Sequence, residues 1–261
     1  MKNNLISVLI TNYNKSKFLH KSLSSVTSQD YKRYEIILYD DCSSDNSINI
    51  INNFKKINLI KNKKRKEHSS ALNQINGLKK AYLKSKGNII CLMDSDDYFK
   101  REKLKKINEY FELHKEKKIL YNLPIVSRNN NFRSVKKKRN LNIWPQIFPT
   151  SCISVKSEYF KLFLKNIKCN KFKNLEIDAR INIFFNFYLN DYNIIHQKLT
   201  NYNFDDSGIT SNIPKYSRKW WFRRSEAFDY LRLVLNKKKK IFKLNSDYIV
   251  TNFITKFLKY L

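Results

Sequence analysis

Glycine is almost missing from this chain, which has only three among its 261 residues: Gly77, Gly87 and Gly208. Several nucleotide-binding and catalytic motifs need two or more glycines at close spacing. The scarcity therefore excludes the G-x-G-x-x-G dinucleotide loop, the phosphate-cradling P-loop and the G-x-S-x-G nucleophile elbow. A nucleotide or phosphate, if bound, must be held by other groups, such as carboxylates and a metal ion.

Cysteine and histidine are also scarce, with four of each. The cysteines form no C-x-x-C pair and the histidines no H-E-x-x-H pair, so neither a zinc site nor a disulfide framework is indicated. We therefore expect a reducing, cytoplasmic location. No apolar run approaches the roughly 18 residues that cross a bilayer, and the first one is too short for a signal peptide. The expected protein is soluble or bound at a membrane surface.

Acidic residues are few beside basic ones, with 22 Asp and Glu against 52 Lys and Arg and a net charge of +30. Such a surface attracts nucleic acids, diphosphates and anionic lipid headgroups. Lys, Asn, Ile, Phe and Tyr are all abundant together, which is also what an AT-rich genome produces. The charge alone therefore leaves a functional and a compositional explanation open. The hydrophobic content of 42% is enough for a substantial core.

Short apolar runs alternate with helical patterns through the first 117 residues. Strands are predicted at 5–11, 34–40, 57–62 and 88–93, and helices at 15–28, 44–54, 69–87 and 100–117. Gly87 is expected to end the third helix. Because alternating strands and helices form parallel β-α-β units, we expect an α/β fold with a mainly parallel central sheet flanked by helices.

The pattern loosens after the apolar run at 119–126. Residues 127–142 predict an exposed polar loop, 151–155 another strand and 177–189 an aromatic-rich amphipathic helix. From Pro214 onward the chain is predicted to be helical. We expect one domain over 1–212, with halves at 1–117 and 118–212, followed by a helical C-terminal extension over 213–261.

Carboxylates cluster where two of the predicted strands end. Asp94 and Asp96 follow NIICLM, and Asp40 and Asp41 follow YEIILY. In open parallel sheets, ligands bind at the carboxyl ends of the strands. Two close carboxylates repel each other, and a hard divalent cation such as Mn²⁺ or Mg²⁺ relieves that repulsion. The positions therefore indicate a metal or polar-ligand site at this edge.

Helix capping is the alternative for both clusters. Asp96 or Asp97 would then cap the helix that follows the fourth strand, and Ser43, Ser44 or Asp45 the helix that follows the second. Capping does not explain why two further carboxylates precede those serines.

Three segments, SVLITNYN, YEIILYDDCSSD and ALNQINGLKKAYLKSKGNIICLMDSDDY, bear a family resemblance. Together they make residues 5–115 similar to the nucleotide-binding half of family 2 inverting glycosyltransferases, which have a GT-A fold. The resemblance implies that Thr11 and Tyr13 contact the nucleotide base, with the tyrosine ring against it. It implies that Asp41, with Asp40 beside it, hydrogen-bonds the base or ribose. One departure is Cys42, where the family commonly has glycine.

The resemblance also implies a role for the D-x-D pair. Asp94 is expected to hold the ribose and the metal, and Asp96 the metal that bridges the diphosphate. Manganese or magnesium is the implied cofactor.

Downstream, KNLEIDARINIFF at 173–185 resembles the family's later acidic motif, which supplies the catalytic base. Asp178 is the first choice for that base and Glu176 the second. The alternative is that both acids only favour the start of a helix. FPTSCIS at 148–154 resembles the strand that lines the sugar and acceptor site, and FDDSGITS at 204–211 a loop that closes over the diphosphate.

The implied activity is a metal-dependent inverting glycosyltransferase. It would move a sugar from a nucleotide-diphospho-sugar, with a UDP-sugar as first choice, to a glycan or lipid-linked acceptor in cell-envelope polysaccharide biosynthesis. Two other classes remain as alternatives: a haloacid-dehalogenase-like phosphatase, which also uses Asp-x-Asp but on its first strand, and a basic nucleic-acid-binding protein. The carboxylate clusters argue against nucleic acid, because they would repel its phosphates. The sugar, the linkage and the oligomeric state stay open.

The C-terminal segment from 237 to 261 combines lysines with an apolar stripe. Ile249, Phe253, Phe257 and Leu261 recur at i, i+4 spacing, which predicts an amphipathic helix. Such a helix can bind the anionic cytoplasmic face of a membrane. The commoner explanation for such a helix is packing on its own core or on a second subunit.

Overall fold

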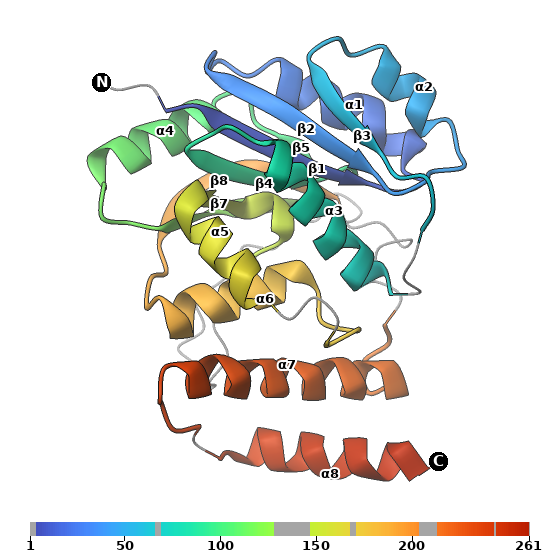
Figure 1. Cartoon of the computed structure of the whole chain (residues 1–261), viewed down its shortest axis with the longest axis vertical. Coiled ribbons are helices and arrows are strands. Elements are labelled where there is room, and N and C mark those ends of the chain that lie inside the picture. The colour runs from blue at the N-terminus through green and yellow to red at the C-terminus, as the bar shows by residue number, and fades with distance from the viewer. Residues whose placement is uncertain are drawn as a thin grey trace.

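The computed structural model describes residues 4–65, 69–127, 147–167, 171–203, 213–242 and 244–260. Its strands form one 8-stranded sheet in the order β3-β2-β1-β4-β7-β6-β8-β5, and helices cover both faces (Figure 1). The predicted α/β fold with a mainly parallel sheet is confirmed. The 204–211 segment and residues 128–142 of the predicted loop lie outside the described residues.

The parallel strands are β1 (Ile6–Asn12), β2 (Tyr34–Asp40), β3 (Ile57–Lys61) and β4 (Ile89–Asp94), and they alternate with α1 (Ser16–Thr27), α2 (Ser47–Asn52) and α3 (Ser70–Lys84). Successive residues of β1 point to opposite faces, so Val8 and Ile10 enter one buried cluster and Leu9 the other. Because helices cover both faces, β1, β2 and β4 contain nearly continuous buried apolar runs, whereas β3 is only partly buried and includes Asn58 and Lys61.

The later elements add antiparallel strands to this sheet. They are β5 (Tyr98–Phe99), α4 (Lys103–Leu113), β6 (Ile119–Ser127), β7 (Ile153–Lys156), α5 (Ser157–Asn166), α6 (Ile177–Ile183) and β8 (Ile194–Asn203). β7 runs antiparallel to β4 and β6, β8 runs parallel to β6, and β5 pairs antiparallel with β8. A 3₁₀ turn over Thr150–Cys152 precedes β7, and α6 continues as a π-helical turn over Phe184–Tyr188.

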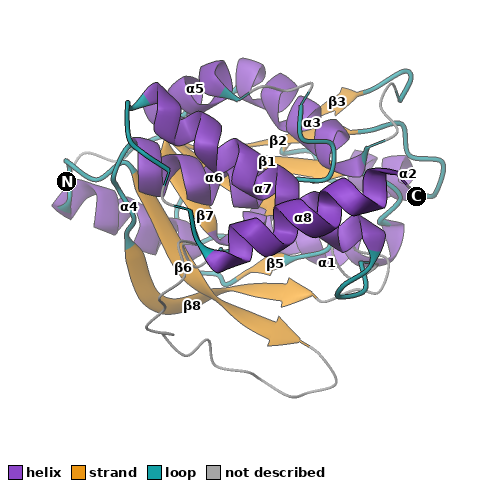
Figure 2. Cartoon of the chain, turned by 90° about the horizontal axis from the view of Figure 1, so that it is seen from below, coloured by secondary structure: helices purple, strands orange, loops and turns teal. Residues whose placement is uncertain are grey.

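The C-terminal segment forms two helices, α7 (Arg218–Lys237) and α8 (Ser246–Tyr260), which confirms the predicted helical extension. Seen from below, α8 lies over α7, and α7 lies against α6 (Figure 2). Tyr230, Leu231 and Val234 of α7 belong to the larger buried cluster. Within the described residues, none of the helices has the length and apolar character needed to cross a bilayer.

Gly87 has a different role from the one predicted. The third helix ends at Lys84, and Gly87 lies beyond it in the connection to β4. Its N–H donates to Ser7 Oγ at 2.8 Å, and a Cβ at this position would come within 2.6 Å of the Ser7 backbone nitrogen. The residue is therefore explained by a close approach to β1 rather than by helix termination.

Candidate active site

The predicted strand-end residues are neighbours in the sheet. Thr11 of β1 lies opposite Tyr39 of β2 on one side and Asp94 of β4 on the other, and Asn12 lies opposite Asp40. The carboxyl ends of these parallel strands form one edge, as the sequence predicts. Both acidic clusters are therefore on the same edge.

Asp40 is buried and its oxygens are occupied from within the chain. Asn12 Nδ2 donates to Asp40 Oδ2 at 2.8 Å, Ser43 Oγ donates to the same oxygen at 2.6 Å, and the Ser43 N–H donates to Oδ1 at 2.9 Å. These bonds join the end of β1 to the turn after β2. Asp40 therefore stabilises the edge of the sheet that carries the neighbouring side chains of the site.

Asp41 and Tyr13 meet at a single arginine. Arg65 Nε lies 2.8 Å from Asp41 Oδ2, and the Arg65 guanidinium lies 3.6 Å from the centre of the Tyr13 ring. Asn62 Nδ2 also donates to Asp41 Oδ1, at 2.9 Å. Arg65 therefore covers both groups to which the resemblance assigns the nucleotide base.

Cys42 adopts the left-handed backbone region, with a φ of 65°. A side chain in this region is strained, and glycine adopts it readily. This explains the one departure from the family pattern in physical terms, because the turn after β2 favours glycine there. The Cys42 side chain is exposed.

Asp94 ends β4 in a crowded acidic environment. Gln74 Nε2 of α3 donates to Asp94 Oδ1 at 2.7 Å, and the Asp94 N–H donates to Ser151 Oγ at 2.9 Å. Burial, and then the negative charges of Asp96 and Asp178, raise the pKa of Asp94 to about 7. Asp178 therefore lies close enough to the D-x-D motif for its charge to act on Asp94.

Asp96 and Asp97 take different partners. Lys15 Nζ lies 2.9 Å from Asp96 Oδ2. Asp97 is fully buried and its Oδ1 accepts the Asn203 N–H at 2.8 Å, while its Oδ2 accepts no hydrogen bond from the residues that the structure describes. Neither acid caps a helix, because α4 begins at Lys103 and Glu102 holds the N-cap position. The capping alternative for this cluster is wrong.

The capping alternative for the other cluster holds in part. α2 begins at Ser47, and Asp45 Oδ1 accepts the Ser47 N–H at 3.0 Å. Asp45 Oδ2 accepts the Ser16 N–H at the start of α1, at 2.8 Å. Asp45 therefore stabilises the beginnings of two helices, and Asp40 and Asp41 have the separate partners described above.

The later acidic motif lies at the start of α6. Asp178 is in the first turn, and its Oδ1 accepts the Ala179 N–H at 2.7 Å. Burial, and then the charge of Glu176, raise the pKa of Asp178 to about 7. Glu176 is buried and its Oε2 lies 2.6 Å from Arg223 Nε of α7. The two acids therefore differ, because Glu176 has a cationic partner at short range.

Three residues of this site carried no local signal in the sequence: Gln74, Tyr202 and Arg223. Gln74 stands on α3 and Arg223 on α7, both far along the chain from the acids that they bind. Tyr202 of β8 has its pKa raised by burial and then by four carboxylates, those of Asp97, Asp178, Asp94 and Asp96. Only the folded arrangement brings these acids around one tyrosine.

The donor set suits a hard divalent cation, although no group of three or more His, Cys, Asp or Glu in the described residues is already arranged around a metal position. Asp94 and Asp96 offer carboxylate oxygens, the ligand type that Mn²⁺ and Mg²⁺ prefer. Burial, and then repulsion from Asp96 and Asp178, raise the pKa of Asp94, and a nearby cation would offset both effects. Asp97 Oδ2 is a buried acceptor with no hydrogen-bond donor among the described residues. The residues fit such an ion.

Sequence comparison places this site in a known family. The profile described as Glycosyl transferase family 2 matches residues 7–192. WfaP of Escherichia coli, a UDP-Glc:alpha-D-GlcNAc-diphosphoundecaprenol beta-1,3-glucosyltransferase, is 37% identical over 113 residues, which are 42% of this chain and 43% of that protein. TuaG of Bacillus subtilis, a putative teichuronic acid biosynthesis glycosyltransferase, is 33% identical over 110 residues, or 41% of each chain. The match thus spans about two-fifths of the length of these relatives.

Solved structures share the fold. Staphylococcus aureus TarS in complex with UDP-GlcNAc aligns with a TM-score of 0.61 and 15% identity, over 96% of this chain and 70% of that one. The mannosyltransferase PcManGT from Pyrobaculum calidifontis, in complex with GDP-Man and Mn²⁺, aligns with a TM-score of 0.54 and 14% identity, over 98% and 70%. At these identities the likeness concerns the GT-A fold.

The profile match covers well over half of the chain, and the carboxylates that drew attention in the sequence all lie inside it: Asp40, Asp41, Asp94, Asp96, Glu176 and Asp178. The chain therefore belongs to glycosyl transferase family 2.

Proposed function

We propose that this chain is a metal-dependent inverting glycosyltransferase that moves a sugar from a nucleotide-diphospho-sugar to a hydroxyl of a glycan or lipid-linked acceptor. The observation that carries the proposal is the convergence of Asp94 and Asp96, from the first half of the chain, with Asp178, from the second. This arrangement supports a donor bound at the sheet edge and a base on the opposite side. TarS was solved with UDP-GlcNAc and WfaP is named for UDP-Glc, so a UDP-sugar is the favoured donor.

The base and ribose of the donor would bind to Thr11, Tyr13 and Asp41, with Asp40 bracing the edge beneath them. Asp41 and Tyr13 already share one cationic partner in Arg65, at 2.8 Å and 3.6 Å. An aromatic ring and a carboxylate that hold a planar guanidinium can also hold a planar base. Arg65 must move aside for the base to take its place.

The metal would be held by Asp96 and Asp94. Bound there, Mn²⁺ or Mg²⁺ would stabilise the negative charge of the departing diphosphate. The Lys15 ammonium at 2.9 Å from Asp96 supports this assignment, because that carboxylate already takes a cation. PcManGT, which shares the fold, was solved with Mn²⁺.

Asp178 would act as the general base. Its carboxylate takes the proton of the acceptor hydroxyl while that oxygen forms a bond to the anomeric carbon from the face opposite the diphosphate. The bond from the anomeric carbon to the diphosphate oxygen breaks, and its electron pair leaves with the diphosphate. A pKa near 7 suits a base that works close to neutral pH. Glu176 is the second choice, because Arg223 already holds it as an ion pair.

The acceptor is proposed to be a cell-envelope glycan or its lipid-linked precursor, met on the cytoplasmic side of a membrane. The names of WfaP and TuaG, which specify a diphosphoundecaprenol acceptor and teichuronic acid, support this class. Cys42, Cys91 and Cys152 are free thiols, as a reducing compartment would leave them.

Thermal melting with a panel of UDP- and GDP-sugars, in Mn²⁺ and in EDTA, tests the proposal. At about 100 times its Kd, the correct donor should stabilise the chain by roughly 2.7 kcal/mol, with Mn²⁺ only. Asp96→Asn should lose that gain, and Asp30→Asn, which removes a carboxylate paired with Arg101 on the surface, should keep it. Equal stabilisation in EDTA would contradict the metal. No response to any nucleotide sugar, together with hydrolysis of a simple phosphoester, would favour the phosphatase.

A further inference from the structure

Helix α8 packs on α7 through its less apolar side. Its two buried residues are Thr251 and Thr255. The large apolar side chains lie on the opposite face, where Ile249 is 57%, Phe253 73% and Phe257 60% exposed. A helix that covers a core normally turns these residues inward. The described part of the chain therefore leaves the apolar stripe of an amphipathic helix facing solvent.

This stripe is larger than a scatter of single apolar residues. Ile249, Phe253, Phe257 and Tyr260 follow one another at intervals of four, four and three residues, so they line one face of α8. Val250 is also exposed beside them. Contiguous exposed apolar patches of this kind mark interaction surfaces.

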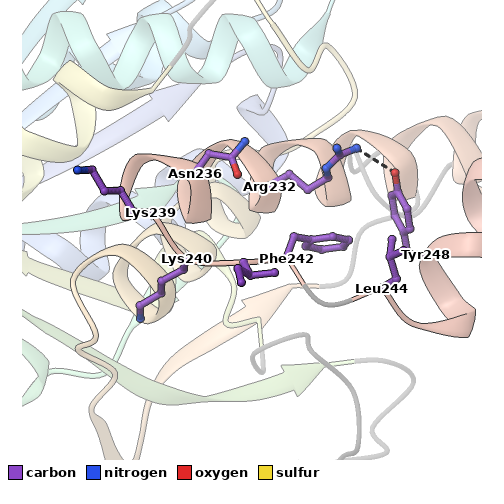
Figure 3. A pocket seen from close by; sticks show the side chains of 8 residues that line it. Arg232, Asn236, Lys239, Lys240, Phe242, Leu244 and Tyr248 are labelled. Atoms are coloured by element: carbon purple, nitrogen blue, oxygen red, sulfur yellow. Dashed lines mark hydrogen bonds between the residues drawn. The ribbon is translucent and has the colours of Figure 1, made fainter.

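A basic cavity lies next to the stripe, at the turn between α7 and α8 (Figure 3). It has a volume of about 540 Å³ and is lined by Arg232, Asn236, Lys239, Lys240, Ile241, Phe242, Leu244 and Tyr248. None of the described residues that line it is acidic. Arg232 Nη1 donates to Tyr248 Oη at 2.9 Å, so the two helices meet across the cavity.

The rim of the cavity continues the apolar surface. Ile241 and Leu244 are both strongly exposed where the turn leaves α7. A site with cations inside and apolar side chains at its rim matches the chemistry of an anionic lipid headgroup and the first carbons of its chains.

Charge decides between a membrane and a second copy of the chain as the occupant. Residues 230–261 contain eight Lys or Arg and one acid, Asp247, which pairs with Arg224. A second copy would bring the same positive charge to the contact, on a chain whose net charge is +30. An anionic bilayer brings the opposite charge and an apolar layer beneath it.

We propose that the α7–α8 turn and the outer face of α8 dock on an anionic membrane. Phe253, Phe257 and Ile249 enter the boundary between headgroups and acyl chains, while Arg232, Lys239 and Lys240 take lipid phosphates. α8 then lies in the plane of the membrane surface. Lys237, the last residue of α7, is 14 positions beyond Arg223, about 21 Å along the helix, and Lys239 and Lys240 follow it. The turn is therefore separate from the carboxylate site, and its docking does not depend on the proposed reaction.

Sedimentation of the full chain with lipid vesicles tests the docking surface. Vesicles that contain phosphatidylglycerol should bind the chain, and vesicles of phosphatidylcholine alone should bind it far less. Raised salt should weaken the binding to the phosphatidylglycerol vesicles. Phe253→Ser with Phe257→Ser should lower the affinity at least about 10-fold. Lys239→Ser with Lys240→Ser should lower it about 25-fold, because each lysine at an anionic surface contributes about a factor of five.

Matched control variants distinguish binding through this surface from nonspecific hydrophobic or electrostatic binding elsewhere on the chain. Leu83→Ser with Leu113→Ser removes two exposed apolar side chains elsewhere, and Lys55→Ser with Lys56→Ser removes two exposed lysines elsewhere. Both controls should bind like the wild type. Equal loss in the controls, unchanged binding in the α8 variants, or no binding by the wild type would overturn the proposal. So would a dimer in solution that the phenylalanine variants convert to a monomer. Circular dichroism shows that each variant is folded.

Discussion

The two acidic clusters at the carboxyl edge of the sheet use the same residue type in opposite electrostatic settings. Asp40 accepts hydrogen bonds from neutral donors, and Asp41 pairs with Arg65. Around β4 and α6, burial and neighbouring carboxylates raise the pKa of both Asp94 and Asp178 to about 7. The first cluster is satisfied by its own chain. The second gains free energy by binding a cation or a proton, which is the property expected of a reactive site.

The largest effect should come from removing the proposed base. Asp178→Asn keeps the side chain's size and its bond to the Ala179 N–H but removes the basic oxygen. We expect kcat to fall about 10²–10⁴-fold with little change in metal-dependent donor affinity, because the donor is held from the other half of the chain. Initial rates of nucleotide release and calorimetry of donor binding measure the two quantities. The acid limb of the wild-type kcat/KM profile near pH 7 should disappear.

Glu176→Gln is the comparison for that variant. It breaks the ion pair with Arg223 and should slow the reaction less than Asp178→Asn does. If Asp178→Asn transfers sugar at nearly the wild-type rate while Glu176→Gln does not, the base is assigned two positions too late. If neither change matters, the two acids serve only the start of α6.

An intermediate effect is expected on the stability of the metal-free chain. The folded pKa of Asp94, about 7, lies above the ordinary value of 3.8. Its contribution to stability is therefore full below about pH 3.8 and is lost as the pH rises through about 7. Asp94→Asn can still accept the hydrogen bond from Gln74. In EDTA, the stability of this variant relative to the wild type should rise as the pH rises from 4 to 8. A gain of about 1 kcal/mol corresponds to a Tm difference of about 2–4 °C.

That variant should also lose the stabilisation by donor and Mn²⁺. A constant Tm difference between Asp94→Asn and wild type across the pH range would show that Asp94 is not under electrostatic strain.

The smallest effect concerns Arg65. In the ligand-free chain Arg65 contacts Asp41 and the Tyr13 ring, the two groups that we propose bind the nucleotide base. Arg65→Ala should therefore tighten the binding of uridine, which has no phosphate, by up to about fivefold, since a partly exposed ion pair contributes about 1 kcal/mol or less. Titration by NMR measures this, with Arg33→Ala as a control. Weaker uridine binding would mean that Arg65 holds the base instead of competing with it.

Much of the fold could be predicted because its signals are local. The apolar runs that became β1, β2 and β4 and the helical spacing of α3 depend on neighbouring residues, and the D-x-D motif follows from its place at a strand end. The prediction for Gly87 was wrong because the sequence does not distinguish a glycine needed for close packing from one that ends a helix. α4 is shorter than the predicted 100–117, because the backbone of Lys100 and Arg101 pairs with Leu199 and Asp30 instead of joining the helix.

The residues that complete the site could not be predicted from such local signals. Tyr202 and Arg223 reach the acids from β8 and α7, and no spacing in the sequence connects them to Asp94 or Glu176. The choice between Asp178 and Glu176 depends on which acid has a cation beside it. That difference arises from tertiary packing, so only the fold provides it.

Arg223 and Arg224 are consecutive residues of α7, and they point to different partners: Glu176 in the acidic motif and Asp247 at the start of α8. Arg223 lies 31 residues beyond the end of the family match at 192. A chimera joined at that boundary would inherit a buried carboxylate from one parent and its counter-charge from another, and an unpaired buried charge is costly. The segment that recombination can exchange without breaking this ion pair is therefore longer than the region of sequence similarity. A breakpoint that keeps both partners together falls after α7.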